Sequence, residues 1–581
     1  MPDAAARAGM AAALLWLLFC LRWFDAAAAW RPPALAAVPP LLLLLALAAA
    51  LGFWLRGRWQ WLRGLPLGPA AGGLGLVLAV AFFFRLPVVA GGAAAAVTAD
   101  GALSGIVALH LLDGSEHLVF VPQVPYSGSL KSHLTALLAL ALDPARAFAL
   151  ASVLFYLGHV AGVFRLALVV SSPRAAVVAG LYAALSPAFV TRYSLSNDGN
   201  YVEVLALGSW ALWLAARATV EPEARPRLVF AAGLLLGLAF WCHILAVIHL
   251  AALAAVLVLS MRLQALRPLA ALGAGAALGY APGWLWNLAN GWESFHYLLP
   301  GKARPGESAE AGIAAVTSGA ADKLWLLLTD HAPVLLGYDT GYAPALDRAL
   351  RALAWLAVAA VAFALARGVR RAARESSWPL ATLLVFAATN LAIAVVALPH
   401  VPGNPRYVLF LMSVAPVLLA DAALGPSTAG ARVGAVKAGI LGALIATGAL
   451  ASFAQVPATL AQDARWRGFV AELEREGVRH CYTDFFLATR INFLSSERVV
   501  CTAKLGPFTT EYFFAYRQRV EQAAEAALIP VNRTAAARVE RRLGELGVAF
   551  ERRDLVKPVL FRLSRKVDPE ELFPGREFPM R

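Results

Sequence analysis

Residues 41–55 read LLLLLALAAALGFWL and contain no charged or amide side chain. Similar apolar runs recur along the chain, among them AALLWLLFCL at 12–21 and AALAAVLVLS at 251–260. A helix needs roughly 20 predominantly apolar residues to cross the hydrocarbon core of a bilayer, and these runs reach about that length with their neighbours. The pattern predicts an α-helical polytopic membrane protein.

The composition of the whole chain agrees with this class. Of the 581 residues, 60% are hydrophobic and only 15% are charged, and the mean hydropathy is +0.66. The formal net charge of +14 would suggest nucleic acid binding in a soluble protein. Here much of that charge is arginine in short loops, where it faces anionic lipid. We therefore expect membrane lipids as partners and no nucleic acid.

The positions of the arginines predict an orientation, because positive charge in short loops marks the cytoplasmic side. The basic loops contain Arg56, Arg58 and Arg63, then Arg165 and Arg174, Arg225 and Arg227, Arg262 and Arg267, and finally Arg367, Arg370, Arg371 and Arg374. About thirteen spans place all these loops on one face, starting near residues 10, 35, 70, 147, 175, 202, 228, 245, 268, 351, 379, 407 and 436. This predicts a bacterial-type inner (plasma) membrane protein with a cytoplasmic N-terminus and a periplasmic or extracellular C-terminus.

The same reading divides the chain into three parts. Residues 1–65 form an N-terminal transmembrane hairpin, and residues 66–455 form a large transmembrane domain with external loops at 94–146 and 290–350. Residues 456–581 are a small extracytoplasmic domain, because charge density rises after ASFAQVPATL at 451–460 and no later run could span a bilayer.

The tail alternates helical and strand patterns, which predicts an α/β domain. Helices are expected at 464–477, 486–494 and 536–547, and strands at 478–485, 497–504 and 557–565. Cys481 and Cys501 occupy corresponding places in two strands joined by one helix, and a βαβ crossover would bring such strands side by side. They are disulfide candidates in an oxidising compartment; the alternative is two ordinary buried thiols.

Three longer segments carry further motifs. Residues 98–147 read TADGALSGIVALHLLDGSEHLVFVPQVPYSGSLKSHLTALLALALDPARA and include the pattern PYxGSLxxxLxALL. Residues 194–214 read SLSNDGNYVEVLALGSWALWL, and residues 403–420 read GNPRYVLFLMSVAPVLLA. Together they resemble the first external loop, the second external loop with its helix, and a late helix entry of the GT-C superfamily. These are integral-membrane glycosyltransferases that include protein O-mannosyltransferase and aminoarabinose transferase relatives.

The resemblance implies a GT-C-like catalytic domain at 66–455 and a catalytic carboxylate early in the first loop, which is Asp100 here. Members often carry a second acid directly after it, where this chain has Gly101, and some carry an acid at the position of Lys131. The resemblance also implies a polyprenyl-phosphate-linked sugar as donor. The acceptor, a protein, a lipid or a glycan outside the cytoplasm, stays open.

Glycosyl transfer requires a base for the acceptor and cations for the leaving phosphate, which the external segments supply. Asp100 is expected to be the general base. Asp198 is the preferred second carboxylate, although SNDGN is also an ordinary turn, and Glu203 is the other candidate or a first-turn helix acid. The candidate substrate-binding residues are Arg406, Tyr407, Lys131, Tyr126, Glu203 and His110.

Several alternatives stay open. Arg406 is best placed for a phosphate, but a juxtamembrane arginine also anchors lipid headgroups. No cofactor is certain; a divalent cation is possible, while the HExxH and GxxxxGK[ST] motifs are absent. Rival functions are a membrane transporter, which would favour inverted repeats, and a non-catalytic polysaccharide-assembly subunit.

Overall fold

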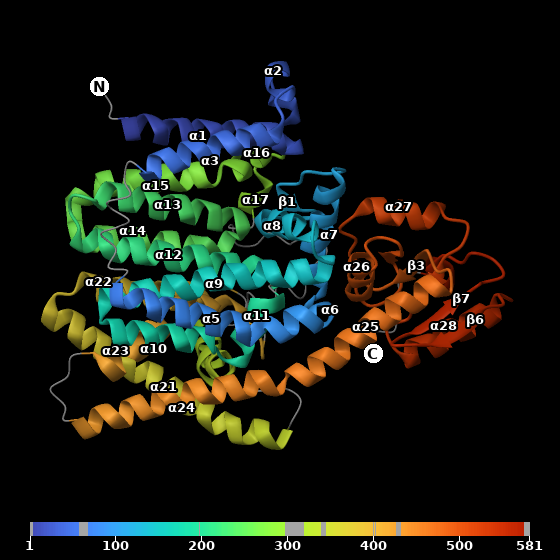
Figure 1. The fold of residues 1–581 in the computed structure, drawn as a ribbon. Coiled ribbons are helices and arrows are strands. Elements are labelled where there is room, and N and C mark those ends of the chain that lie inside the picture. The colour runs from blue at the N-terminus through green and yellow to red at the C-terminus, as the bar shows by residue number, and fades with distance from the viewer. Residues whose placement is uncertain are drawn as a thin grey trace.

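The computed structural model describes residues 4–56, 68–196, 198–296, 319–337, 344–398, 400, 402–425 and 431–574. Long helices run alongside one another in a bundle, and a mixed α/β domain sits at one end (Figure 1). Within the described ranges, seven helices are long and apolar enough to cross a membrane, or nine if two bent pairs each count as one span. The predicted polytopic helical class is confirmed; the number thirteen stays a prediction.

An N-terminal hairpin packs against the bundle. It consists of α1 (Ala4–Trp23) and α3 (Pro40–Arg56), connected by the 3-10 helix η1 (Asp25–Trp30) and α2 (Pro33–Ala36). The indole of Trp16 donates a hydrogen bond to the carbonyl of Leu278 at 3.0 Å, which ties the hairpin to the bundle. The basic residues Arg58 and Arg63 lie outside the described residues.

The bundle helices coincide with the apolar runs of the sequence. They are α5 (Gly68–Gly91), α9 (Pro144–Val170), α10 (Pro173–Ala184), α11 (Ala188–Ser196), α12 (Tyr201–Val220), α13 (Arg225–Cys242), α14 (Val247–Met261), α15 (Leu266–Gly279), α16 (Ala281–Ala289), α21 (Pro344–Glu375), α22 (Trp378–Ala397), α23 (Ala415–Leu424) and α24 (Ala431–Ala454). The 3-10 helices η3 (Ile244–Ala246), η4 (Arg262–Ala265) and η6 (Arg406–Ser413) join them.

The predicted external loop at 290–350 is only partly described, because residues 297–318 and 338–343 lie outside the described ranges. The described part contains the short helices α17 (Glu293–His296), α19 (Ala320–Leu326) and α20 (Ala332–Leu336), with the π-helical turn η5 (Leu327–His331) before α20.

Helices α13 and α15 pack closely through glycines spaced four residues apart. A Cβ atom at Gly233 or Gly237 would lie 2.2 Å or 2.1 Å from a carbonyl oxygen of α15, and one at Gly275 or Gly279 would lie 2.2 Å or 2.3 Å from a carbonyl of α13. Small residues at this spacing let membrane helices approach until their backbones touch. These four positions therefore accept no larger residue without separating the two helices.

The span predicted to start near 175 is broken in the structure. Helices α10 and α11 meet at an angle of 70°, and η6 and α23 meet at 42°. The guanidinium of Arg85, which is completely buried in α5, fills the first break by donating to the Ala184 carbonyl at 2.8 Å and to Ser194 Oγ at 2.6 Å. The bend directs α11 toward the residues around Asp198.

The first external segment folds against the end of the bundle. It contains α6 (Ala93–Ala96), α7 (Ala99–Asp113), the antiparallel strands β1 (Phe120–Val121) and β2 (Val124–Gly128), and α8 (Leu130–Ala139). Gly128 in the PYSGSL motif lies so close to α13 that a Cβ atom there would be 2.1 Å from the carbonyl oxygen of Trp241. Only glycine fits this contact.

The C-terminal domain contains a five-stranded sheet in the order β4-β3-β5-β7-β6. Its strands are β3 (His480–Thr483), β4 (Val500–Ala503), β5 (Ala527–Leu528), β6 (Glu551–Asp554) and β7 (Pro558–Phe561). The helices are α25 (Val456–Arg475), α26 (Phe485–Leu494), α27 (Phe514–Gln522), α28 (Arg533–Glu545) and α29 (Pro569–Leu572). The sequence did not predict α27, α29, β5 or β6, and α25 begins earlier than the predicted 464.

Two features connect this domain to the rest of the chain. Helix α25 follows α24 after the single residue Gln455, so that residues Val433–Arg475 form one helical span of 43 residues, which Figure 1 shows running from the bundle into the C-terminal domain with a change of direction between the two helices. The carboxylate of Asp463 in α25 accepts the Ala94 backbone N–H at 2.6 Å, which fixes α25 to α6.

The predicted neighbouring strands are present. Strands β3 and β4 are parallel, and Cys481 is the direct partner of Cys501. The Cα atoms of the two residues are 4.4 Å apart, and the structure joins their sulfurs in a disulfide bond. Of the two interpretations of these cysteines, the structure has the cross-link rather than the free thiols.

Candidate active site

Asp100 lies in the first turn of α7, at the end of the bundle that faces the C-terminal domain. Thr98 caps this helix, because its Oγ accepts the N–H of Gly101 at 3.1 Å. The hydroxyl of Thr98 in turn donates to the Asp198 carboxylate. A single capping residue thereby links the two predicted carboxylates, and the amino-terminal end of α7 favours negative charge beside it.

The surroundings of Asp100 give its carboxylate the properties of a base. Asp100 is exposed to solvent, yet burial of the carboxylate is the largest cause that raises its pKa to about 6. The Asp100 side chain thus keeps contact with water while the surrounding protein removes part of the hydration of its carboxylate. The Asp198 carboxylate raises the pKa further, whereas the Arg406 guanidinium lowers it. The structure thus brings Asp100, Asp198 and Arg406 into one electrostatic group.

Asp198 starts the 3-10 helix η2 (Asp198–Asn200), which joins α11 to α12. Gly199 and Asn200 both adopt left-handed φ angles of 69° and 61°, so the turn predicted from SNDGN is real. The amide of Asn200 donates to Ser127 Oγ at 3.0 Å and to the Gly128 carbonyl at 2.7 Å. These bonds anchor the turn to the PYSGSL motif and hold Asp198 at the end of α7.

GT-C enzymes often carry an acidic residue directly after the first-loop carboxylate, and the structure shows why this chain has Gly101 at that position. A Cβ atom at this position would lie 3.2 Å from the ring of Phe148 and 3.2 Å from the Ser196 carbonyl oxygen. Contacts of this length leave no space for a longer side chain. The second carboxylate of this cluster therefore comes from the other external segment, at Asp198.

Arg406 begins η6 and is half-buried. One terminal nitrogen of its guanidinium donates to the hydroxyl of Tyr407 at 3.0 Å, and its Nε has no hydrogen-bond partner among the described residues. Its central carbon lies 4.9 Å from the centre of the Tyr407 ring. Tyr407 itself is buried, so that it orients the guanidinium and leaves donors of Arg406 for an anion.

Lys131 and Glu203 are both fully buried within the bundle end. The Lys131 Nζ lies 3.2 Å from the centre of the Phe148 ring. Burial lowers the pKa of the Lys131 ammonium, while the carboxylates of Glu203 and Asp198 oppose that effect. In this conformation Lys131 acts on the carboxylates through its charge and does not reach the surface where a substrate would enter.

A row of aromatic rings extends from β2 to η6, next to the group of Asp100, Asp198 and Arg406. The ring of Tyr126 lies 5.6 Å from that of His243, His243 lies 4.9 Å from Tyr201, and Tyr201 lies 5.8 Å from Phe410. The row connects β2 to η6, the element that carries Arg406. The sequence interpretation assigned nothing to His243, because a lone histidine in an apolar helix carries no signal of this position.

The structure places His110 outside this cluster. Its Nδ1 lies 2.8 Å from Glu116, and its Nε2 lies 3.1 Å from Glu497 of the C-terminal domain. Burial alone would lower its pKa, but the hydrogen bonds to the two glutamates raise the pKa to about 9. Both ring nitrogens are engaged, so His110 joins α7 to the C-terminal domain and we do not retain it as a substrate-binding residue.

Arg490 is a functional candidate that the sequence interpretation missed. It belongs to α26 of the C-terminal domain, donates to the Ala94 carbonyl at 3.2 Å and stacks 3.7 Å from the Trp466 ring centre. Burial lowers its pKa to about 10, while the charge of Asp198 opposes that shift. A basic residue in an amphipathic helix is common, and nothing in the sequence shows that it approaches a carboxylate 292 residues earlier.

No metal-ligand group stands out in the part of the chain that the structure describes, since no three or more His, Cys, Asp or Glu side chains gather closely enough there to hold an ion. Asp100 and Asp198 contribute two carboxylates, and the neighbouring groups Arg406 and Lys131 are cations. Magnesium is commonly held by one or two protein carboxylates, with water and substrate phosphate oxygens as its other ligands, so the divalent cation stays a prediction.

Known proteins resemble this chain in fold but not detectably in sequence. No protein-family model matches the sequence, and no curated protein matches it. Among solved structures, ArnT from Cupriavidus metallidurans in the apo state superposes with a TM-score of 0.56 at 12% identity, covering 85% of this chain and 98% of ArnT. The same enzyme bound to undecaprenyl phosphate gives a TM-score of 0.55 at 11% identity, covering 84% and 98%.

A second similar structure is the archaeal oligosaccharyltransferase AglB from Archaeoglobus fulgidus, in complex with an inhibitory peptide and a dolichol-phosphate. It superposes with a TM-score of 0.50 at 13% identity, covering 82% of this chain and 70% of AglB. Both similar proteins are glycosyltransferases of the GT-C superfamily. The chain therefore has the GT-C fold of integral-membrane glycosyltransferases.

Proposed function

We propose that this protein is a glycosyltransferase that moves a sugar from a polyprenyl-phosphate donor to an extracytoplasmic acceptor, with Asp100 as the general base. One observation carries the proposal: the Asp100 carboxylate is accessible to solvent, has its pKa raised to about 6, and shares an electrostatic group with Asp198 and Arg406. A base is most effective when its pKa lies near the working pH.

The chemistry follows from these positions. The acceptor oxygen or nitrogen attacks the anomeric carbon of the sugar, and Asp100 takes the proton that the acceptor loses. The bond between the anomeric carbon and the phosphate oxygen breaks, and the polyprenyl phosphate leaves with the electron pair. Asp198, fixed by Thr98, raises the pKa of Asp100 and so strengthens it as a base.

Arg406 is assigned to the leaving phosphate. Its guanidinium keeps an Nε donor without a described partner, and Tyr407 orients the group. A cation that is already held at the position where negative charge develops stabilises the transition state, because the cation does not have to reorient during the reaction. Lys131 and Glu203 act behind this group through their charges, and Tyr126 belongs to the aromatic row that supports it.

The donor class rests on the fold and on the membrane. ArnT was solved with undecaprenyl phosphate and AglB with dolichol-phosphate, and nucleotide sugars are absent outside the cytoplasm of a bacterial-type cell. The proposed orientation places the N-terminus in the cytoplasm and the C-terminal domain outside. The disulfide of that domain supports this orientation, since disulfides persist in oxidising compartments.

The test uses the purified full-length protein in lipid nanodiscs with a panel of undecaprenyl-phosphate monosaccharides and a membrane extract as the source of acceptor. The measured quantity is release of undecaprenyl phosphate, followed by mass spectrometry. We expect Asp100→Asn to lower turnover about 10²–10⁴-fold. Addition of EDTA tests the predicted divalent cation: a large loss of turnover that Mg²⁺ or Mn²⁺ restores would show that the cation is required, and turnover within about twofold would show that it is not.

A matched control separates catalysis from folding. Asp113 lies at the other end of the same helix, is exposed and accepts a backbone N–H from Ser115. Asp113→Asn should therefore keep wild-type turnover. Undiminished turnover of Asp100→Asn would remove Asp100 as the base, and the absence of any donor turnover by the wild type across the panel would favour the transporter or assembly-subunit functions.

A further inference from the structure

A polar cavity lies far from Asp100, at the other end of the bundle. Asp198 directly precedes α12, whereas Thr219 lies at the far end of that 20-residue helix, which is roughly 30 Å long at 1.5 Å per residue. The cavity has a volume of about 240 Å³, several times the roughly 30 Å³ that one water occupies in the liquid. It is lined by Thr219, Arg225, Ser260, Met261, Arg262, Gln264 and Trp378.

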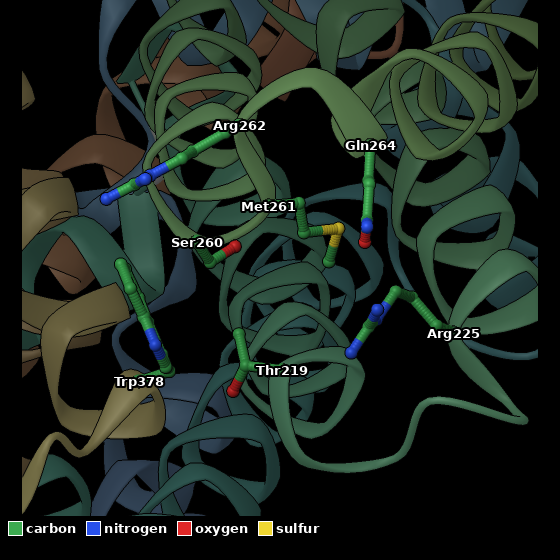
Figure 2. A pocket seen from close by; sticks show the side chains of 7 residues that line it. All are labelled: Thr219, Arg225, Ser260, Met261, Arg262, Gln264 and Trp378. Atoms are coloured by element: carbon green, nitrogen blue, oxygen red, sulfur yellow. The ribbon is translucent and has the colours of Figure 1, made fainter.

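The lining residues come from separate parts of the chain. Arg225 begins α13, Arg262 lies at the turn between α14 and η4, and Trp378 begins α22. Figure 2 shows the Arg225 guanidinium and the Gln264 amide pointing into the space above Thr219, with Arg262 extending on the side of Trp378. A ligand in this space would connect three segments of the bundle.

The two arginines carry charge that no described side chain neutralises. Arg225 donates its Nε to the Ala218 carbonyl at 2.9 Å, and this bond leaves its terminal nitrogens directed to the cavity. Within the described ranges, neither Arg225 nor Arg262 forms an ion pair with a carboxylate: of the two glutamates of that loop, Glu221 pairs with Arg217 at 2.7 Å, and Glu223 is exposed and forms no ion pair. Two cations around one cavity attract an anion, and guanidinium groups match phosphate oxygens in geometry.

The surface beside the cavity is apolar and exposed. Leu263, which follows Arg262 directly, is 90% exposed, and Leu266, at the start of α15, is 73% exposed. Leucines of this exposure next to a cationic cavity form the arrangement that a phospholipid needs, since its phosphate requires cations and its acyl chains require apolar contact. Trp378 adds an aromatic ring, which is typical of the interface between headgroups and acyl chains.

We propose that this cavity binds a phosphate group at Arg225, with Arg262 adding positive charge on the side of Trp378, and that its source is the headgroup of an anionic phospholipid whose acyl chains contact Leu263 and Leu266. Gln264, Ser260 and Thr219 add hydrogen-bonding groups around the phosphate. Bound there, the lipid holds the α12–α13 loop, the α14–η4 turn and the start of α22 together. The site is independent of the proposed glycosyl transfer, because it lies at the opposite end of the bundle.

The experiment measures binding and stability of the purified full-length protein in neutral detergent, without any activity assay. Three probes are added in parallel: phosphatidylglycerol, phosphatidylcholine and inorganic phosphate. Native mass spectrometry counts the retained lipids, and thermal unfolding records the Tm. For the wild type we expect retained phosphatidylglycerol and a Tm increase of about 3 °C or more, since a ligand that binds only the folded state stabilises it. Phosphatidylcholine should give neither effect.

The variants identify the cavity. Arg225→Gln/Arg262→Gln should lose the retained phosphatidylglycerol and the Tm increase. Arg227→Gln/Arg267→Gln, which removes the same charge from two exposed arginines of the same loops that do not line the cavity, should behave as the wild type. If the first variant does not fold, Arg225→Lys/Arg262→Lys keeps the charge and should retain weakened binding, because lysine lacks the guanidinium fork.

The outcomes decide between the sources. A Tm increase with inorganic phosphate equal to that with phosphatidylglycerol would support the phosphate site but assign it to a soluble phosphate. Equal retention of phosphatidylglycerol by the wild type and the Arg225→Gln/Arg262→Gln variant, or equal retention of the two lipids by the wild type, would overturn the proposal.

Discussion

Arg85 and Arg406 are two arginines near the same end of the bundle, and their surroundings differ. Arg85 is completely buried and donates to Ser194, Ala81, Ala184 and Ser186, so its guanidinium is nearly saturated with partners. Arg406 is half-buried, donates to Tyr407 and keeps Nε without a described partner. Arg85 donates hydrogen bonds to the protein's own groups at the bend between α10 and α11. Arg406 keeps a hydrogen-bond donor that another molecule could use.

This difference gives a rule for the charged residues of the molecule. A charge whose donors all meet protein groups stabilises the fold, because a buried polar group without partners costs free energy. A charge that keeps unmet donors or an exposed, desolvated carboxylate serves a ligand. By this rule we assign structural roles to Arg85 and His110, and the proposed functional roles to Asp100 and Arg406.

Of the two arginines, Arg406 should give the larger effect on turnover when it is replaced by glutamine. Removal of a fixed donor from a developing anion costs about 2.7–4 kcal/mol of transition-state stabilisation, so we expect turnover about 10²–10³-fold lower with an unchanged Tm. The measurement is undecaprenyl phosphate release together with thermal unfolding. Arg192→Gln is the control, because Arg192 is an exposed cation of α11 at the same end of the bundle. A loss of Tm without loss of turnover would reverse the roles of Arg85 and Arg406.

Arg85→Gln should show the opposite pattern. It leaves the Ala184 carbonyl and the Ser186 and Ser194 hydroxyls without their buried donor, at a cost of about 1–3 kcal/mol for each unsatisfied group. We expect a Tm lower by several degrees in detergent and, in the fraction that remains folded, turnover within a few-fold of the wild type. Wild-type stability would show that the break between α10 and α11 does not depend on this side chain.

The pH dependence of turnover tests the coupling within the cluster. The pKa of Asp100 is raised to about 6, so kcat/KM should fall tenfold per pH unit below about pH 6 as the base becomes protonated. Asp198→Asn removes a carboxylate that raises this pKa and should move the midpoint to lower pH. Arg406→Gln removes a cation that lowers it and should move the midpoint to higher pH. Midpoints that stay in place in both variants would disprove the coupling.

The smallest expected effect is that of His110→Gln on stability. The pKa of His110 is raised to about 9 by its hydrogen bonds to Glu116 and Glu497, against the effect of burial. A histidine with a raised pKa stabilises the folded state fully below its unfolded pKa of about 6.5, and this contribution disappears as the pH rises through 9. The difference in Tm between wild type and variant should therefore be larger at pH 7 than at pH 9.5, and the pH midpoint of turnover should not move.

The sequence predicted the features that depend on local pattern. Apolar runs of membrane length predicted the helices, and alternating patterns around Cys481 and Cys501 predicted two adjacent strands. Asp100, Asp198 and Arg406, chosen as candidates from external segments and from the resemblance, lie in one electrostatic group. The assignment of their roles stays a prediction until activity is measured.

The remaining features depend on contacts between distant segments. Strand β6 is exposed at every residue, so it shows no alternation of apolar and polar side chains. The break between α10 and α11 depends on Arg85 of another helix, and the burial of Lys131 depends on Phe148 of α9. Arg490 reaches the site only because its domain docks on α6 and α7. No local pattern encodes such positions.

Because α25 follows α24 after the single residue Gln455, the number of residues in this span sets how the C-terminal domain is rotated relative to the bundle. Each residue inserted near Gln455 would turn the domain by about 100° and displace it by about 1.5 Å. A single insertion would therefore carry Asp463 away from the Ala94 backbone and Arg490 away from Asp198. An insertion of four residues adds about one full turn and would restore most of the original orientation of the domain. In this protein the number of residues in a helical span therefore sets which face of the C-terminal domain lies against Asp100 and Asp198.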